Sequence, residues 1–144
     1  MAMKTISAHG TLNAGMAIEV QCGNHRLIMD QPKSAAGQDL GPPPLEAILA
    51  AVAGCFGTIG RFIAHQQKIE LRGMRFEIEA DYDPAGLLGR DPAVRPGFQE
   101  LRIKVDIDAD LDRAGKQALL EQIEQRCPVA DNLTHGTRLV SVLL

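Results

Sequence analysis

Residues 44–67, PLEAILAAVAGCFGTIGRFIAHQQ, form the stretch that decides the fold. Apolar side chains recur in it at spacings of three and four residues, the period of one helix face. Pro44 stands where a proline is tolerated in a first helical turn. Each of Gly54, Gly57 and Gly60 costs about 1 kcal/mol relative to alanine inside a helix, so we expect another backbone to approach closely there. The pattern predicts a helix that is buried all round.

Three short apolar or alternating runs precede this helix, and they are typical of strands. We expect a two-residue hairpin turn at Gly23-Asn24. An irregular loop rich in glycine and proline over 31–43 then leads into the helix. The three predicted strands cover residues 3–9, 15–22 and 24–30.

Two strands with clear alternation follow the helix, over 74–81 and 101–108. Each has one apolar and one charged face, which predicts an antiparallel sheet with one buried side. The connection over 84–97 is rich in glycine and proline and is expected to be an exposed loop.

The C-terminal part alternates between helix and strand signals. Asp110 or Asp112 is expected to cap a helix over about 113–126. A short helix from Pro128 to near Gly136 and a final strand over 138–143 complete the order. This order predicts the α+β class, with antiparallel sheets around one long buried central helix, in a single domain over residues 1–144.

Composition narrows the function. The formal net charge is −3, with 15 Lys and Arg against 18 Asp and Glu, and aromatic content is 3%. A nucleic-acid partner is therefore not expected. The N-terminus lacks the apolar region of a signal peptide, and the apolar run over 47–60 is shorter than the roughly 20 residues that span a bilayer. We expect a cytoplasmic protein without membrane contact.

The three cysteines differ in their surroundings. Cys55 lies beside the apolar stripe of the long helix, where a free thiol is either an inert core residue or a reactive group. Cys127 precedes Pro128 and follows Arg126. It is either a small junction residue or a helix N-cap whose thiol pKa is lowered by the helix dipole. Cys22 reads as structural. The four histidines form no local pair with each other or with a cysteine, so no metal or cofactor is expected.

Two motifs together resemble the OsmC/Ohr family, in its OsmC-like branch. The first is the run from Gly41 to Cys55, a proline-rich entry into a helix of small residues that ends at cysteine. The second is Cys127-Pro128-Val129 after an amphipathic helix. The resemblance implies intertwined homodimers that reduce small organic hydroperoxides and are regenerated by a dithiol reductant. It also implies that Cys55 is the peroxidatic thiol and Cys127 the resolving one.

The sequence departs from the family pattern at the carboxylate that activates the thiol. The resemblance places it ten residues before Cys55, where this chain has Leu45. Glu46 is the tentative replacement, but nine helical steps put it about 180° from the cysteine. A first-turn glutamate is also favoured by the helix dipole alone. Arg26, on an early strand, is the weak candidate for the activating arginine.

A second function stays open for the same sequence. Leu45 in place of a carboxylate favours a non-enzymatic OsmC-like dimer that binds a small apolar ligand or acts as a redox-responsive scaffold. The two hypotheses differ in the expected reactivity of Cys55 and in hydroperoxide turnover.

Overall fold

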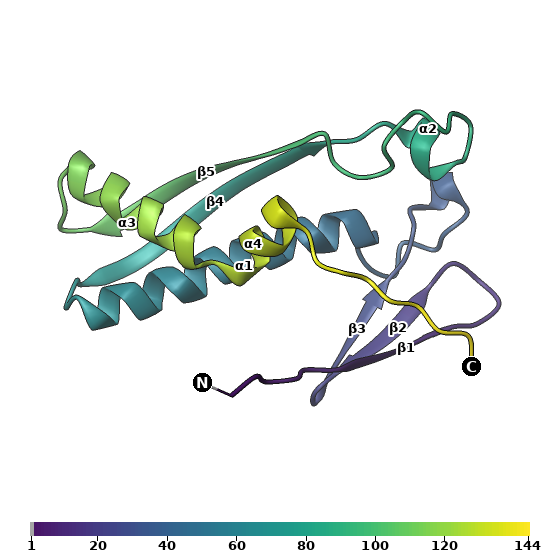
Figure 1. The fold of residues 1–144 in the computed structure, drawn as a ribbon, viewed down its shortest axis with the longest axis horizontal. Helices are drawn as coiled ribbons and strands as arrows, with labels where there is room; N and C mark the ends of the chain where they lie inside the picture. Colours follow the sequence, from purple (N-terminus) through teal and green to yellow (C-terminus); the bar gives the residue numbers. More distant parts are fainter. Residues whose placement is uncertain (1) are drawn as a thin grey trace. The chain divides into compact units, whose positions relative to one another are not determined.

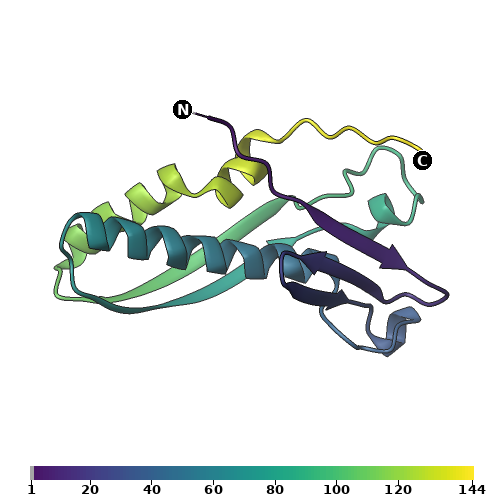
Figure 2. The same ribbon diagram turned by 90° about the horizontal axis from the view of Figure 1, so that it is seen from below.

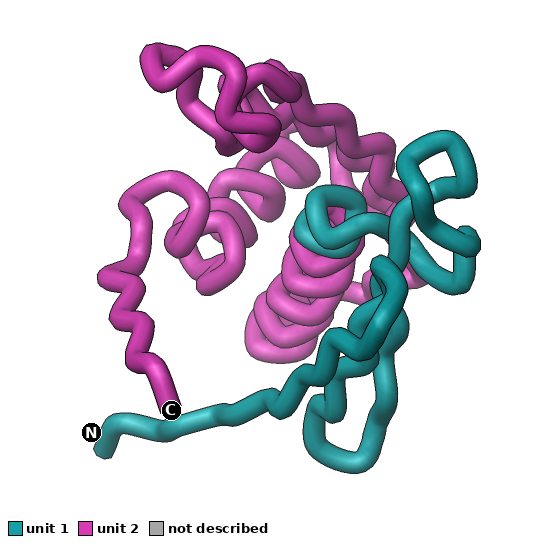
Figure 3. Tube along the Cα trace, turned by 90° about the vertical axis from the view of Figure 1, so that its right-hand side faces the viewer, with its two compact units in different colours: residues 1–48 teal, residues 49–144 magenta. Residues whose placement is uncertain are grey.

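The structure is a computed structural model that describes residues 2–144. The chain divides into two compact units, the first ending at Ile48 and the second running from Leu49 to Leu144 (Figure 3). The boundary falls inside the long helix, so the two units are described one after the other.

The first unit is a three-stranded antiparallel sheet in the order β1-β2-β3. Cys22 pairs with His25, so Gly23-Asn24 is the predicted hairpin turn, and Gly23 has the positive φ of 58° that glycine adopts readily. The first strand begins and ends later than predicted. Gly10 does not end it, because Gly10 pairs with Val20 inside the ladder. The strands are β1 (Ala8–Leu12), β2 (Ile18–Cys22) and β3 (His25–Met29).

A buried carboxylate organises the loop after β3. Asp30 is 1% exposed, and its side chain accepts hydrogen bonds from the backbone N–H groups of Gln31, Gln38 and Leu40 at 2.7, 3.1 and 3.2 Å. The Asp30 N–H donates to the Pro42 carbonyl at 3.3 Å. One residue therefore ties the end of β3 to the entry of the long helix. The loop also holds the single 3-10 turn η1 (Lys33–Ala35).

The second unit is built on an antiparallel β4–β5 pair. Met74 lies opposite Ile107 and Phe76 opposite Val105, while charged residues face each other on the other side, as in the Arg75–Asp106 pair. This is the predicted alternation. The elements, shown in Figure 1, are α1 (Pro44–Gln66), β4 (Leu71–Asp81), α2 (Pro84–Leu87), β5 (Glu100–Ala109), α3 (Arg113–Arg126) and α4 (Pro128–His135).

The core of this unit joins α1, α3 and the apolar side of the β4–β5 pair (Figure 2). Ile63 of α1 and Ile123 of α3 are both fully buried, at 0% exposure. Asp112 caps α3 by accepting the Gly115 N–H at 2.8 Å, as expected of one of the two candidates. Further buried members are Val52, Phe56, Leu71, Ile107, Leu119 and Cys127.

Three expectations need correction. The loop over 84–97 contains the short helix α2. The predicted strand over 138–143 does not form, because no strand edge in residues 2–144 pairs with it, and Leu139 and Val142 are about 80% exposed (84% and 80%). At Gly57 and Gly60 the close neighbours are side chains rather than a backbone, with Met74 Sδ 2.8 Å from a Cβ placed on Gly60.

Helix α1 is only partly covered by its own chain. Its length and apolar composition would suffice to cross a bilayer, but core helices of soluble proteins share both properties. In its most apolar 18-residue window, 28% of the residues are buried. The sequence-based expectation of burial all round is thus met on one side only, by the core described above.

We predict that Asp30→Asn destabilises the first unit at neutral pH. Burial acts to raise the pKa of Asp30, but its three backbone donors outweigh burial and lower it. A lowered folded-state pKa stabilises the protein above the unfolded value of about 3.9, and this stabilisation is lost as pH falls through the folded-state pKa. We expect the melting temperature to fall by several degrees at pH 7, with faster amide exchange at Gln38 and Leu40.

The matched control is Asp39→Asn, a change at an exposed position of the same loop. The melting difference between wild type and Asp30→Asn should shrink as pH falls below 3. Equal melting temperatures at pH 7, or a difference that persists in acid, contradict this account of the loop.

Candidate functional site

Two thiols from distant parts of the chain meet inside the second unit. Cys55 lies in the middle of α1, half-buried against the core, and Cys127 lies at the junction of α3 and α4 with 1% exposure. Cys127 Sγ donates a hydrogen bond to Cys55 Sγ at 2.8 Å. A disulfide bond is about 2.05 Å long, so a sulfur displacement of less than about 1 Å separates this pair from a bridge.

Cys127 is the predicted N-cap of α4. Its Sγ accepts a hydrogen bond from the Ala130 N–H at 3.4 Å, and Pro128 occupies the first helical position. Of the two possibilities that the sequence left open for Cys127, a lowered thiol pKa is contradicted. Burial raises the pKa of the Cys127 thiol, the hydrogen bond to Cys55 raises it further, and the Ala130 N–H opposes both only in part.

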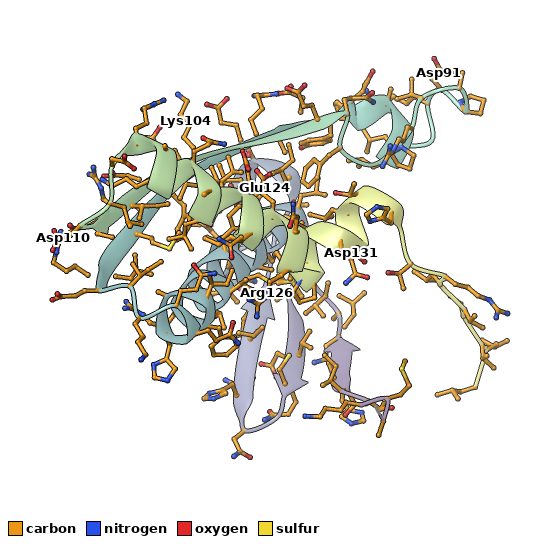
Figure 4. The ribbon with its side chains drawn as sticks, turned by 60° about the vertical axis from the view of Figure 1, so that its left-hand side comes forward. Asp91, Lys104, Asp110, Glu124, Arg126 and Asp131 are labelled. Atoms are coloured by element: carbon orange, nitrogen blue, oxygen red, sulfur yellow. The ribbon has the colours of Figure 1, made fainter. Side chains whose placement is uncertain are left out.

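Two charged residues near this junction, Arg126 on α3 and Asp131 on α4 (Figure 4), are paired with residues other than the cysteines. Arg126 donates from Nη1 to Gln66 Oε1 at 2.9 Å. Asp131 on α4 pairs with His135 at 3.0 Å. Among residues 2–144, the hydrogen bonds at the two sulfurs come from Cys127 and from backbone N–H groups at the start of α4, chiefly that of Ala130. The thiol pair therefore lies in an apolar setting with backbone polarity at one end.

The two predicted activating residues, Glu46 and Arg26, both belong to the first unit. Glu46 is exposed in the first turn of α1, and within the described chain it makes no ion pair. Arg26, on β3, lies 3.7 Å from Glu19 across the first sheet. Leu45 stands half-buried one residue before Glu46. Both assignments stay predictions.

Sequence reasoning missed two features around the site. One is the hydrogen bond from Cys127 to Cys55, which joins residues 72 positions apart in the sequence and is therefore not predicted by any local pattern. The other is the carboxylate of Asp30, which ends the predicted strand over 24–30 and for which the sequence predicts no role. The proline- and glycine-rich run after it, which leaves many backbone N–H groups without regular partners, is the available signal. Cys22 is half-buried on β2 and is a free thiol, as are the other two cysteines.

Comparison with known families decides the relationship. The family described as OsmC-like protein matches residues 37–141, a range that includes both Cys55 and Cys127. The chain belongs to the OsmC-like family. Its fold is the OsmC-like α+β fold, with antiparallel sheets and one long helix, as predicted. No curated protein sequence matches it significantly.

Solved structures of other family members share this fold at low identity. An OsmC-like protein from Mycoplasma pneumoniae is 18% identical with a TM-score of 0.77, over 90% of this chain and 87% of that one. An organic hydroperoxide resistance protein from Legionella pneumophila is 20% identical with a TM-score of 0.69, over 94% and 93%. The organic hydroperoxide resistance protein OhrB of Bacillus subtilis is 22% identical with a TM-score of 0.61, over 92% and 93%. At these identities the likeness shows the fold.

Proposed function

We propose that this protein reduces organic hydroperoxides with a pair of cysteines. The observation that carries the proposal is the 2.8 Å contact between the sulfurs of Cys55 and Cys127. Membership of the OsmC-like family and the fold shared with two organic hydroperoxide resistance proteins support it. Cys55 is the more exposed thiol of the pair, so it is the one that a hydroperoxide reaches.

The proposed hydroperoxide reduction proceeds in three steps. The Cys55 thiolate attacks the O–O bond of ROOH, which yields the sulfenic acid Cys55–SOH and, after uptake of one proton, the alcohol ROH. The Cys127 thiol then attacks the sulfenic sulfur, which forms the disulfide and releases water. A dithiol reduces the disulfide by thiol–disulfide exchange and becomes oxidised itself. The short distance between the sulfurs favours the second step over further oxidation of Cys55.

A second candidate function is supported by what surrounds Cys55. No charged side chain hydrogen-bonds to its sulfur among residues 2–144, and Leu45 stands where the family pattern has a carboxylate. A non-enzymatic dimer that binds a small apolar ligand, or a redox-responsive scaffold, fits such a site. It differs from the first proposal by predicting slow or absent turnover.

The peroxidase proposal predicts distinct outcomes for the cysteine variants. Cumene hydroperoxide consumption with an excess of dithiol should be abolished in Cys55→Ser. Without dithiol, Cys127→Ser should consume one equivalent per chain and stop at the Cys55 sulfenic acid, because no resolving thiol is present. Cys22→Ser is the control and should keep wild-type turnover. Wild-type protein that consumes no hydroperoxide with any dithiol refutes the enzyme and leaves the second candidate.

The side of α1 that its own chain leaves exposed supports a homodimer as the functional form of the protein. Ala50, Gly54 and Thr58 follow one another at the four-residue helical spacing and are exposed, and a Cβ placed on Gly54 meets nothing within 4 Å. Phe62, the next in this series, is 55% exposed. A second copy that packs on this side would bury these apolar groups. Free thiols in the pair are consistent with a cytoplasmic protein.

The dimer proposal predicts that Gly54→Leu weakens self-association by at least about tenfold, equivalent to about 1.4 kcal/mol. Within a single chain this change meets open space and removes a helical glycine, so folding should not suffer. Ala118→Leu, on the exposed side of α3, is the matched control. Sedimentation velocity over a concentration series measures the effect. A monomeric wild type, or equal association of both variants, contradicts the interface.

A further inference from the structure

The hydrogen bond between the two thiols has a direction, and this direction matters before any hydroperoxide arrives. Cys127 Sγ donates and Cys55 Sγ accepts. In the described chain, this is the polar contact of the Cys55 sulfur, because Glu46 is exposed without an ion pair and Arg26 pairs with Glu19. A thiolate at Cys55 would be desolvated on its core side, so a donor aimed at it is worth more than the same bond in water.

The donor is itself polarised by a helix terminus. The Ala130 N–H at the start of α4 donates to Cys127 Sγ at 3.4 Å, and Cys127 in turn donates to Cys55. The positive end of a helix lies at its N-terminus. Hydrogen bonds in a chain strengthen one another. The backbone of α4 thereby acts on Cys55 through one intervening thiol.

Burial decides which of the two thiols keeps its proton. Cys127 is 1% exposed while Cys55 is half-buried, and a charged sulfur is disfavoured where water is excluded. Among residues 2–144 no charged side chain hydrogen-bonds to either sulfur, so burial sets this order. One thiol therefore serves as the donor and the other as the acceptor.

We propose that Cys127 acts twice: first as a positioning residue whose S–H donates to the Cys55 sulfur and stabilises its thiolate, and then as the resolving thiol. The first role replaces the activating carboxylate of the family pattern, whose position is occupied by Leu45 in this chain. The role of Cys127 as a resolving thiol rests on the proposed hydroperoxide reduction. Its role as a hydrogen-bond donor does not require a hydroperoxide. In the second role the same S–H proton leaves with the sulfenic oxygen as water when the disulfide forms.

The test compares Cys127→Ser with Cys127→Ala, both in a Cys22→Ser background so that Cys55 is the only thiol left. Serine and alanine are equally unable to form a disulfide, but the serine hydroxyl keeps a donor. The readout is the rate of Cys55 alkylation by iodoacetamide as a function of pH. We expect the serine variant to react at least about fivefold faster than the alanine variant at pH 7, with its pH profile centred at lower pH.

Two controls separate the donor from helix stability. Asn132→Ala removes a side-chain hydrogen bond to the Pro128 carbonyl at 2.9 Å but keeps both thiols and the Ala130 N–H; it should leave the Cys55 profile unchanged. Cys127→Val fills the buried space without a donor and should behave like alanine, so it replaces the alanine variant if circular dichroism shows that this variant is unfolded.

Equal alkylation profiles for the folded serine and apolar variants overturn the donor role. The same variants, given cumene hydroperoxide and a sulfenic acid trap, test the proposed function separately. A serine–alanine difference in alkylation without sulfenic acid would reject the peroxidase and keep the donor. Sulfenic acid at equal rates in both variants would keep the peroxidase and reject the donor.

Discussion

Burial of one side of α1 against α3 and the β4–β5 pair is the constraint on which the site depends. The core side of α1 is formed by the buried side chains of Val52, Phe56 and Ile63. Cys55, three residues after Val52, lies at the edge of this side and packs against the core. On the other helix, Leu119, Ile123 and Cys127 follow at steps of four residues. The two thiols therefore extend the apolar stripes of two packed helices, and the packing that forms the core also brings the sulfurs to 2.8 Å.

The same burial divides the roles of the two sulfurs. The pKa of the Cys127 thiol is raised chiefly by burial, so this thiol is held protonated as a donor, while Cys55 stays partly open to solvent. Family members are expected to use charged groups at this point, and this chain has Leu45 there. A donor relay from the backbone of α4 needs no buried charge and pays no ionic desolvation penalty.

Much of this arrangement was predictable from the sequence, and the failures have physical causes. Periodicity located α1, α3 and α4 closely, because their apolar spacing and caps at Asp112 and Cys127 are local signals. The strand predicted over 138–143 failed because alternation reports a half-buried environment, whereas a strand also needs an edge to pair with. A lowered Cys127 pKa, one of the two possibilities that the sequence left open, is contradicted because the helix terminus is visible in the sequence but the extent of burial is not.

The central claim is that Cys55 and Cys127 form one redox unit and that Cys22 lies outside it. The most direct test is a count of free thiols, made under denaturing conditions after one equivalent of organic hydroperoxide is added per reduced chain without any reductant. The account predicts a fall from three thiols to one, with Cys22 recovered as the free thiol by peptide mapping. Three remaining thiols, or a disulfide that includes Cys22, would contradict it.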